Sequence, residues 1–363
     1  MRVKLEDVCE RGSSNIKQSD IIKMSGNYPI YGASGLAGKV NFYHQEQPYV
    51  AVVKDGAGIG RTTLNPAKSS VIGTMQYLIP KKNVLPEYLF YVVSYMHLEK
   101  YYTGATIPHI YFKDYKNEEF NLDNIEKQLE IIDVLGRCKK VIEARKQELV
   151  ELDSLTKARF VEMFGTLDTP TQAFEKATLK ELCNKITDGK HGGCKSEVGT
   201  ERYFVGAREI YDDDVHYESA PEINIEEFEK DYKRCNVEIG DFLIVNTGAT
   251  IGKSAIACDK RTEHTLLQKS VALLKVKKDV LNPIFLKWCY RVNTKMYMVE
   301  NASAQPNLLL SKINATVIYV PDIELQNQFA DFVHQVDKSK VAVQKALDET
   351  QILFDSLMQK YFG

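Results

Sequence analysis

The sequence predicts a mixed α/β protein with an internal repeat: a globular half, a long helix, a second globular half and a second long helix. The chain has 363 residues, which is too long for one comfortable core. Two similar segments end in Phe164-Gly165 and Phe362-Gly363, 198 positions apart. Each of these segments ends in a long stretch with a helical apolar period. Together these observations predict a pseudo-twofold internal repeat.

Further matches follow in the same order along both halves. Pro108 matches Pro306 at the same offset, and the turn Gly56–Arg61 (Gly-Ala-Gly-Ile-Gly-Arg) matches Gly248–Lys253 (Gly-Ala-Thr-Ile-Gly-Lys) at a shorter one. The shared order predicts four segments: residues 1–122, 123–165, 166–321 and 322–363.

The two helical segments carry a 4-3 spacing of apolar residues over four heptads, which is typical of a coiled-coil seam. The seam positions include Ile131, Leu135, Ile142 and Leu149 in the first copy, and Phe329, Val333, Val336, Val343 and Leu347 in the second. Each helix would be roughly 60 Å long. The copies differ within the seam, for example at Arg145 and Val343, and this favours pairing of one helix with the other.

The globular halves combine short strands and helices. Residues 49–53 and 241–245 are apolar runs before glycine turns, as expected of buried strands. Residues 85–96 and 281–292 predict helices, each with a proline suited to the first turn. Residues 212–231 are acidic and predict an exposed insertion.

Composition narrows the class of protein. The formal net charge of −2 neither favours nor excludes nucleic acid, so any phosphate binding must come from local patches. Seven scattered cysteines without a CxxC pair indicate reduced thiols, neither a disulfide framework nor a zinc ribbon. No run of 18 apolar residues occurs and the first residues lack a signal-peptide core, so we expect neither a membrane span nor a secretory signal.

Nucleotide-binding and catalytic motifs fail on inspection. The turn Gly56–Gly60 leads into Arg61-Thr-Thr-Leu-Asn-Pro, not into the helix that a phosphate-binding turn requires. The turn Gly248–Gly252 has three residues between its glycines where a Walker A motif has four. Both predict glycine hairpins with a basic tip, Arg61 or Lys253, which either touches a phosphate or is a solvated turn. The histidines are isolated and no catalytic constellation is present, so we expect no enzyme activity from the chain alone.

Two polar loops are further candidates. Tyr28-Pro-Ile-Tyr31-Gly-Ala-Ser34-Gly35 and Thr187-Asp-Gly-Lys190-His191 offer several short donors and acceptors, although each also suits an ordinary structural turn.

In combination, these motifs resemble the specificity subunit of type I restriction–modification systems over the whole chain. The resemblance is carried by Tyr28–Gly35, by Ile186-Thr-Asp-Gly189-x-His191, and by the closing patterns Gly104-Ala-Thr-Ile-Pro-His109 and Ser303-Ala-Gln-Pro-Asn-Leu308. It implies that each globular half is a target recognition domain and that the helices form an antiparallel coiled coil, which spaces the halves and docks partners. It also implies binding to double-stranded DNA, two methyltransferase subunits, motor–nuclease subunits and a cytoplasmic location in a bacterium or archaeon. The partners would use S-adenosylmethionine, ATP and magnesium to make N6-methyladenine on a flipped base, while this chain binds no cofactor.

Recognition domains vary within this family, so contact residues are inferred from chemistry alone. Two unlike readers predict a split, asymmetric target, with polar loops meeting base edges and phosphates. We expect DNA contacts from Tyr31, Ser34, Lys54, Arg61, Lys190, His191, Arg208, Asn246, Lys253 and Ser254. We expect partner subunits to dock on Ile131, Leu135, Ile142, Leu149, Phe329, Val333, Val336, Val343 and Leu347. Two alternatives remain open: a coiled-coil scaffold with two protein-binding heads, and a self-sufficient enzyme with a glycine-loop cofactor.

Overall fold

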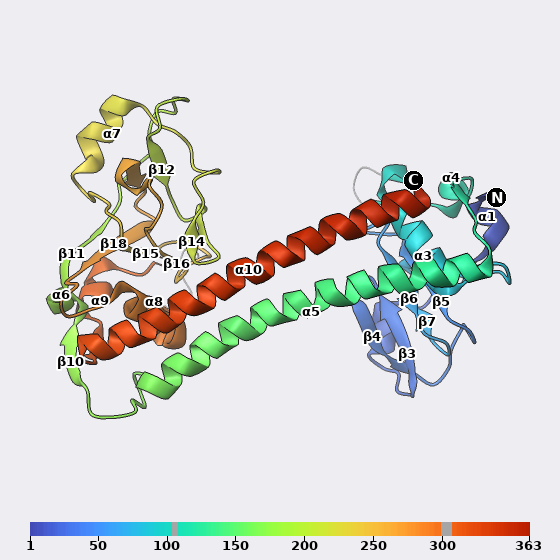
Figure 1. The fold of residues 1–363 in the computed structure, drawn as a ribbon, viewed down its shortest axis with the longest axis horizontal. Helices are drawn as coiled ribbons and strands as arrows, with labels where there is room; N and C mark the ends of the chain where they lie inside the picture. Colours follow the sequence, from blue (N-terminus) through green and yellow to red (C-terminus); the bar gives the residue numbers. More distant parts are fainter. Residues whose placement is uncertain (104–107, 299–306) are drawn as a thin grey trace. The chain divides into compact units, whose positions relative to one another are not determined.

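The computed structural model describes residues 1–103, 108–298 and 307–363 (Figure 1). The chain divides into two compact units. Unit 1 contains Met1–Gln147 together with Gln344–Gly363, and unit 2 contains Glu148–Val343. The closing motifs predicted at 104–109 and 303–308 therefore lie mostly outside the described residues, except for Pro108, His109, Asn307 and Leu308.

Unit 1 is built around a four-stranded antiparallel sheet with the order β2-β8-β5-β6. Its strands are β1 (Arg2–Lys4), β2 (Cys9–Ser13), β3 (Tyr28–Gly32), β4 (Gly35–Val40), β5 (Tyr49–Val53), β6 (Thr62–Asn65), β7 (Ser70–Val71), β8 (Met75–Pro80) and β9 (Glu119–Asn121). Its short helices are α1 (Leu5–Val8), α2 (Gln18–Ile21), α3 (Pro86–Tyr95), the 3₁₀ turn η1 (Leu98–Tyr101) and α4 (Phe112–Tyr115).

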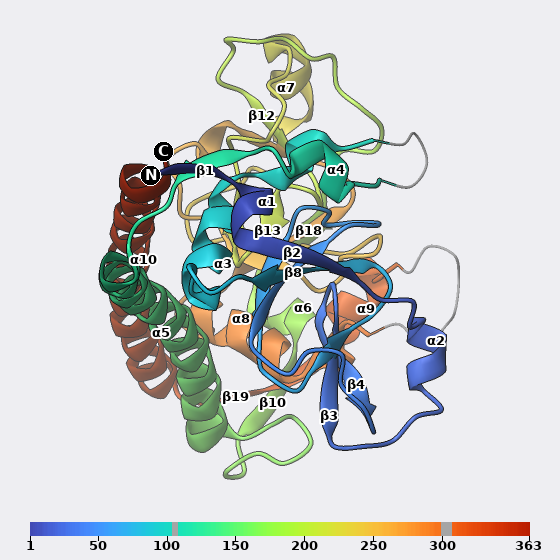
Figure 2. The ribbon, with the colours of Figure 1, turned by 90° about the vertical axis from the view of Figure 1, so that its right-hand side faces the viewer.

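Strand β5 is buried along its whole length because the sheet has a core on both faces. Val50 and Val52 pack with α3 and the long helices, whereas Tyr49, Ala51 and Val53 pack with β3 and β4. This alternation follows from the two-residue period of a strand. The helices and the β3–β4 hairpin thus cover opposite faces of the sheet (Figure 2).

Unit 2 repeats this plan with the sheet order β11-β18-β15-β16. Its strands are β10 (Glu175–Thr178), β11 (Cys183–Asp188), β12 (Tyr203–Val205), β13 (Ile210–Tyr211), β14 (Asp214–Val215), β15 (Phe242–Val245), β16 (Ser254–Ile256), β17 (Thr265–Leu267), β18 (Val271–Val276) and β19 (Val317–Val320). Its short helices are α6 (Leu179–Leu182), α7 (Ile225–Tyr232), η2 (Thr262–His264), α8 (Pro283–Val292), η3 (Thr294–Met296) and α9 (Leu310–Ala315).

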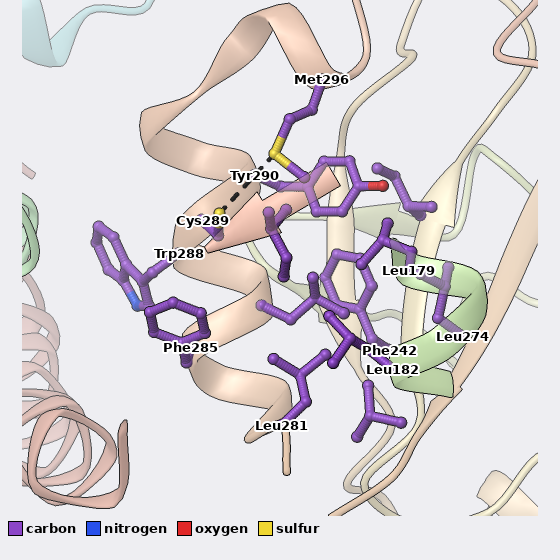
Figure 3. Close-up of a cluster of buried hydrophobic side chains, with 14 of the residues drawn as sticks. Leu179, Leu182, Phe242, Leu274, Leu281, Phe285, Trp288, Cys289, Tyr290 and Met296 are labelled. Carbon is purple, nitrogen blue, oxygen red and sulfur yellow. Dashed lines mark hydrogen bonds between the residues drawn. The ribbon is translucent and has the colours of Figure 1, made fainter. Parts of the chain in front are cut away.

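The equivalence extends to side chains and to pairings outside the main sheet. In β15, Phe242 and Ile244 face the core beneath α8, and Leu243 and Val245 face the opposite core. Figure 3 shows the first of these cores, where Phe242 lies among side chains of α6 and α8. Each unit also has one parallel strand pair, β3 with β7 and β12 with β17. The predicted internal repeat is confirmed.

One expectation about unit 2 was wrong in part. Residues 212–231 are acidic, but they are not simply an exposed insertion, because they contain β14 and most of α7. Phe228 and Ile223 are buried against Phe204 and Leu266, and they give this lobe a small apolar cluster of its own. Val215 and Tyr217 of the same segment are buried in a neighbouring core, so four apolar side chains among many charges anchor it.

The long helices are α5 (Ile125–Phe164) and α10 (Ile323–Phe362), which confirms the prediction of two long helices. In unit 2, Phe160 near the end of α5 packs edge-on against Phe329 near the start of α10, with 5.3 Å between ring centroids. In unit 1, Ile131 near the start of α5 shares a core with Met358 near the end of α10. The end of each helix therefore packs beside the start of the other, so the two helices are antiparallel.

A buried glutamine joins each long helix to its globular half. In unit 1, the side-chain oxygen of Gln128 accepts a hydrogen bond from the Leu85 N–H at 2.9 Å, and its amide donates to the Asn83 and Asp123 carbonyls at 3.0 and 2.9 Å. Leu85 is the residue before helix α3. One side chain thus fastens the first turn of α5 to the start of α3.

Gln326 makes the same three bonds in unit 2. Its oxygen accepts from the Asn282 N–H at 2.9 Å, and its amide donates to the Val280 and Pro321 carbonyls at 3.0 and 2.7 Å. Both glutamines are fully buried. The repeated bonds fix α5 and α10 on their halves in the same way, and we call them the glutamine clamps.

We expect Gln326→Leu to destabilise unit 2 by about 2–4 kcal/mol, because it leaves a buried N–H and two carbonyls without partners. Urea unfolding followed by circular dichroism measures the change. Gln335→Leu is the matched control, since Gln335 lies on the same helix but is exposed. Equal stability of the two variants would mean that the clamp contributes little.

Candidate functional site

The glycine turn between β5 and β6 is a closed hairpin tip. The Gly60 N–H donates to the Val53 carbonyl and the Val53 N–H donates to the Arg61 carbonyl, both at 2.9 Å. Gly60 has φ of +81°, and a Cβ there would lie 2.6 Å from the Glu99 nitrogen. The position therefore requires glycine. Strand β6 follows directly, so the predicted hairpin is confirmed.

The turn between β15 and β16 repeats these bonds. The Gly252 N–H donates to the Val245 carbonyl at 3.0 Å, and the Val245 N–H donates to the Lys253 carbonyl at 2.8 Å. Strand β16 follows and pairs with β15, as the sequence predicted. Neither turn opens a helix, so neither has the helix N-terminus of a phosphate-binding loop.

Arg61 and Lys253 occupy equivalent places after these turns, and both are exposed. Arg61 Nη1 donates to the Ala33 carbonyl at 3.1 Å, which links the glycine turn to the turn between β3 and β4. Ser34 is exposed in that neighbouring turn, and Tyr31 is half-buried at the end of β3. The structure thus brings three of the predicted residues, Tyr31, Ser34 and Arg61, to two adjoining turns.

Lys54 stands at the start of the same glycine turn and is half-buried, with its amine 4.0 Å from the Asp55 carboxylate. The side chain of Lys253 has no hydrogen-bond or ion-pair partner among the described residues. The two hairpin tips therefore share a backbone but differ in how their cations are held.

Lys190 and His191 follow β11 in unit 2 and face acidic residues. Lys190 is half-buried, with its amine 2.6 Å from Asp231 and 3.6 Å from Glu227, both on α7. The hydrogen bond to Asp231 raises the pKa of Lys190. His191 is exposed, 3.3 Å from Asp188. The positive charge of Lys190 is therefore already balanced by the two carboxylates of α7.

The remaining predicted contacts differ in accessibility. Arg208 is exposed between β12 and β13. Asn246 is 4% exposed, and its carbonyl accepts from the Leu308 N–H at 2.7 Å. Ser254 is also 4% exposed and lies in β16 opposite Ile244. Asn246 and Ser254 would have to move before they could touch a ligand.

The segment that follows each set of undescribed residues packs beside the glycine turn. In unit 1, the Gly56 N–H donates to the Pro108 carbonyl at 3.0 Å, and the Ile110 N–H donates to the Lys54 carbonyl at 2.9 Å. His109, which looked isolated in the sequence, has its Nδ1 2.6 Å from Asp55 Oδ1. In unit 2, the Thr247 hydroxyl lies 3.4 Å from Asn307 Oδ1. Sequence reasoning missed both pairs. The aligned closing patterns showed that His109 and Asn307 occupy corresponding positions, but not which residues they contact.

The predicted seam residues of the long helices are turned inward. Leu149 is half-buried and the others are buried, namely Ile131, Leu135, Ile142, Phe329, Val333, Val336, Val343 and Leu347. Their side chains pack within this chain. A partner that meets the helices would first meet their outer faces, where Val141, Val150, Leu155, Val341 and Ile352 are exposed.

The metal-binding residue types and two buried thiols bear on whether this chain carries chemistry of its own. Within residues 1–103, 108–298 and 307–363, His, Cys, Asp and Glu side chains form no cluster of three able to hold a metal. Burial raises the pKa of the Cys9 and Cys183 thiols to about 12, so they stay protonated and are poor nucleophiles. In the described part of the chain, no helix is long and apolar enough to span a bilayer.

Comparison with known proteins identifies the class of this chain. The family model described as type I restriction modification DNA specificity domain matches residues 1–153 and 172–350. The fold is similar to the type I restriction-modification S subunit from M. genitalium, with a TM-score of 0.62 and 15% identity over 100% of this chain and 96% of that one.

A second structure, described in connection with complex assembly and conformational transition of the type I R-M system, has a TM-score of 0.59 and 14% identity, covering 99% of this chain and 97% of that one. No curated protein matches the sequence. With one specificity domain in each half, the chain belongs to the family of type I restriction–modification DNA specificity subunits.

Proposed function

We propose that this chain recognises a split, asymmetric DNA target and directs partner subunits to it for adenine-N6 methylation and restriction. The observation that carries the proposal is the duplicated unit: one sheet topology and one glycine hairpin occur twice, with different side chains at the surface. Specificity subunits of this family recognise DNA and are themselves non-catalytic. Two unlike surfaces on one scaffold suit two unlike half-sites.

The surfaces around the two hairpins differ in charge and shape. In unit 1, Arg61 and Ser34 lie on adjoining turns. The sequence around them has no acidic segment like residues 212–231 of unit 2. In unit 2, Lys253 is accompanied by the additional elements β13, β14 and α7, whose carboxylates hold Lys190. Arginine and lysine near backbone turns can contact phosphates, while polar loop side chains read base edges. Of the predicted contacts, we retain Ser34, Arg61, His191, Arg208 and Lys253 as exposed candidates. The half-buried Tyr31, Lys54 and Lys190 are retained as partly accessible ones.

The partners in this proposal are two methyltransferase subunits and motor–nuclease subunits in the cytoplasm. They would supply S-adenosylmethionine, ATP and magnesium, and they would dock on the long helices. Exposed apolar side chains on α5 and α10 support docking there, because single apolar residues along a helix flank act as anchors in interfaces. The buried seam would hold the two helices together beneath such partners.

The alternative is a coiled-coil scaffold whose two heads bind proteins. Titration of the chain with its methyltransferase partners against duplex DNA at several salt concentrations separates the two. Sequence-dependent and salt-dependent binding supports the proposal. Failure to bind DNA at any of these salt concentrations supports the scaffold. Tight binding of S-adenosylmethionine or ATP by the chain alone would instead favour a self-sufficient enzyme.

The two halves should be separable readers. Exchanging residues 1–122 for the corresponding segment of another specificity subunit should change one half of the methylated motif and leave the other half intact. Sequencing of modified adenines in cells that carry the hybrid measures this. A change in both halves would contradict modular reading.

The long helices should set the spacing between half-sites. Inserting seven residues near Gln147 in α5 and seven near Val343 in α10 preserves the seam register and adds roughly 10 Å to each helix. The spacer in the methylated motif should then grow by about three base pairs. Four residues inserted in α5 alone add roughly 6 Å and rotate the helix by about 40° beyond a full turn, and methylation should fail. Full activity with an unchanged spacer in both cases would exclude this role.

The hairpin cations should contact the DNA backbone. Arg61→Ala and Lys253→Ala should weaken binding about equally for all sequences, and each should make the salt dependence shallower by roughly one phosphate's contribution. Lys82→Ala is the control, because Lys82 is exposed just after β8, at the end of the sheet away from the glycine turn. Wild-type affinity at every salt concentration would show that the tips are only solvated turns.

A further inference from the structure

The contacting side chains beside each glycine turn differ between the halves, although their surroundings are the same. In sequence, Gly56 corresponds to Gly248, Pro108 to Pro306 and Ile110 to Leu308. In structure, both closing segments form an antiparallel bridge with the turn, through Asp55 and His109 in unit 1 and through Thr247 and Asn307 in unit 2. The constant residues build the scaffold, and the two variable residues touch each other in both halves.

The pair in unit 1 fixes the orientation of an imidazole. Asp55 Oδ1 lies 2.6 Å from His109 Nδ1, and an ionised carboxylate can only accept a hydrogen bond. Nδ1 therefore carries the hydrogen, and while the ring is neutral Nε2 presents a lone pair. The side chain of His109 is 36% exposed, and Nε2 has no partner among the described residues. This half thus presents an oriented acceptor.

The pair in unit 2 presents a different set of groups. The Thr247 hydroxyl lies 3.4 Å from Asn307 Oδ1 and 3.3 Å from Asn246 Oδ1, so its one hydrogen is shared between two amide acceptors. Asn307 is exposed. The amide nitrogen keeps two donors, and the oxygen keeps a second lone pair. This half thus presents an amide that can donate and accept at once.

We propose that the Asp55–His109 and Thr247–Asn307 pairs are the positions at which the two halves read a base edge. His109 would accept from an exocyclic amino group of adenine or cytosine, and Asn307 would take the paired donor and acceptor of an adenine edge. In each pair the first residue is a positioning residue and the second makes the contact. The proposal rests on the DNA-recognition function proposed above.

The chemistry of the first pair favours a base edge over a phosphate. A phosphate oxygen needs a donor, whereas the ring in its neutral form offers an acceptor at Nε2. In either form of the ring, the Asp55 carboxylate next to it would repel a phosphate. The neighbouring glycine turn removes side-chain bulk at the same place, so the backbone of the hairpin does not obstruct an approaching duplex.

The test transfers one pair into the other half. The full chain carrying D55T and H109N is assembled with its methyltransferase subunits, and its binding to a library of duplexes with randomised positions is compared with that of the wild type. The preferred base should change at one position of the first half-site, with about a tenfold shift in relative affinity, while the second half-site stays the same. H97N is the matched control, because His97 is an exposed histidine of unit 1 outside this site, 3.3 Å from Glu99.

A reciprocal variant, T247D with N307H, should change only the second half-site, and H109Q alone covers the case in which a double variant does not fold. If the wild-type complex prefers certain bases and the variants keep the same preference at every position, the proposal is overturned and the proposed function stays intact. An equal loss of affinity for all sequences also overturns the proposal, because it would assign these residues to the DNA backbone. A wild-type complex without any sequence preference would instead refute the proposed function itself.

Discussion

The buried glutamine at the start of each long helix is the contact on which the arrangement of each half depends. Gln128 and Gln326 satisfy an N–H before α3 or α8 and two carbonyls that no strand or helix pairs. In an apolar interior such groups have no water to bind, so any other placement of the helix start would leave them unpaired. The three bonds therefore define one direction in which each long helix can leave its globular half. In unit 2, Phe329 lies one turn beyond Gln326 on α10 and packs against Phe160 of α5, so the aromatic contact between the two helices stands beside this clamp.

The features predictable from sequence are those written in both copies. The glycine hairpins, the helices after Pro86 and Pro283, and the seam of α5 and α10 all have counterparts at a nearly constant offset, and all occur in the structure. Gln128 and Gln326 also stand at this offset, but a glutamine in a helical pattern looks like a solvent-facing residue until its partners are seen.

Features that depend on contacts between distant segments were not predictable. The pairing of Asp55 with His109 joins residues 54 positions apart, and nothing in the local sequence of either one indicates the other. The acidic segment 212–231 appeared exposed because charge dominates its composition. Its anchoring depends on Phe228 and Ile223 meeting Phe204 and Leu266, and on Val215 and Tyr217 joining a neighbouring core. Likewise, the seam pattern predicts which residues face an apolar neighbour, but not whether that neighbour belongs to the same chain.

Unit 1 combines residues from distant parts of the chain. Gln344–Gly363 belongs to it together with Met1–Gln147, and Met358 and Phe362 lie in the same core cluster as Tyr88 and Leu89. During synthesis, the first globular half must wait while about 200 further residues are made before its own core can close. Until then Tyr88 and its neighbours lack part of their apolar cover and are open to aggregation or chaperone binding. Damage to the last turns of α10 would accordingly weaken the first half of the protein, which is encoded at the opposite end of the gene.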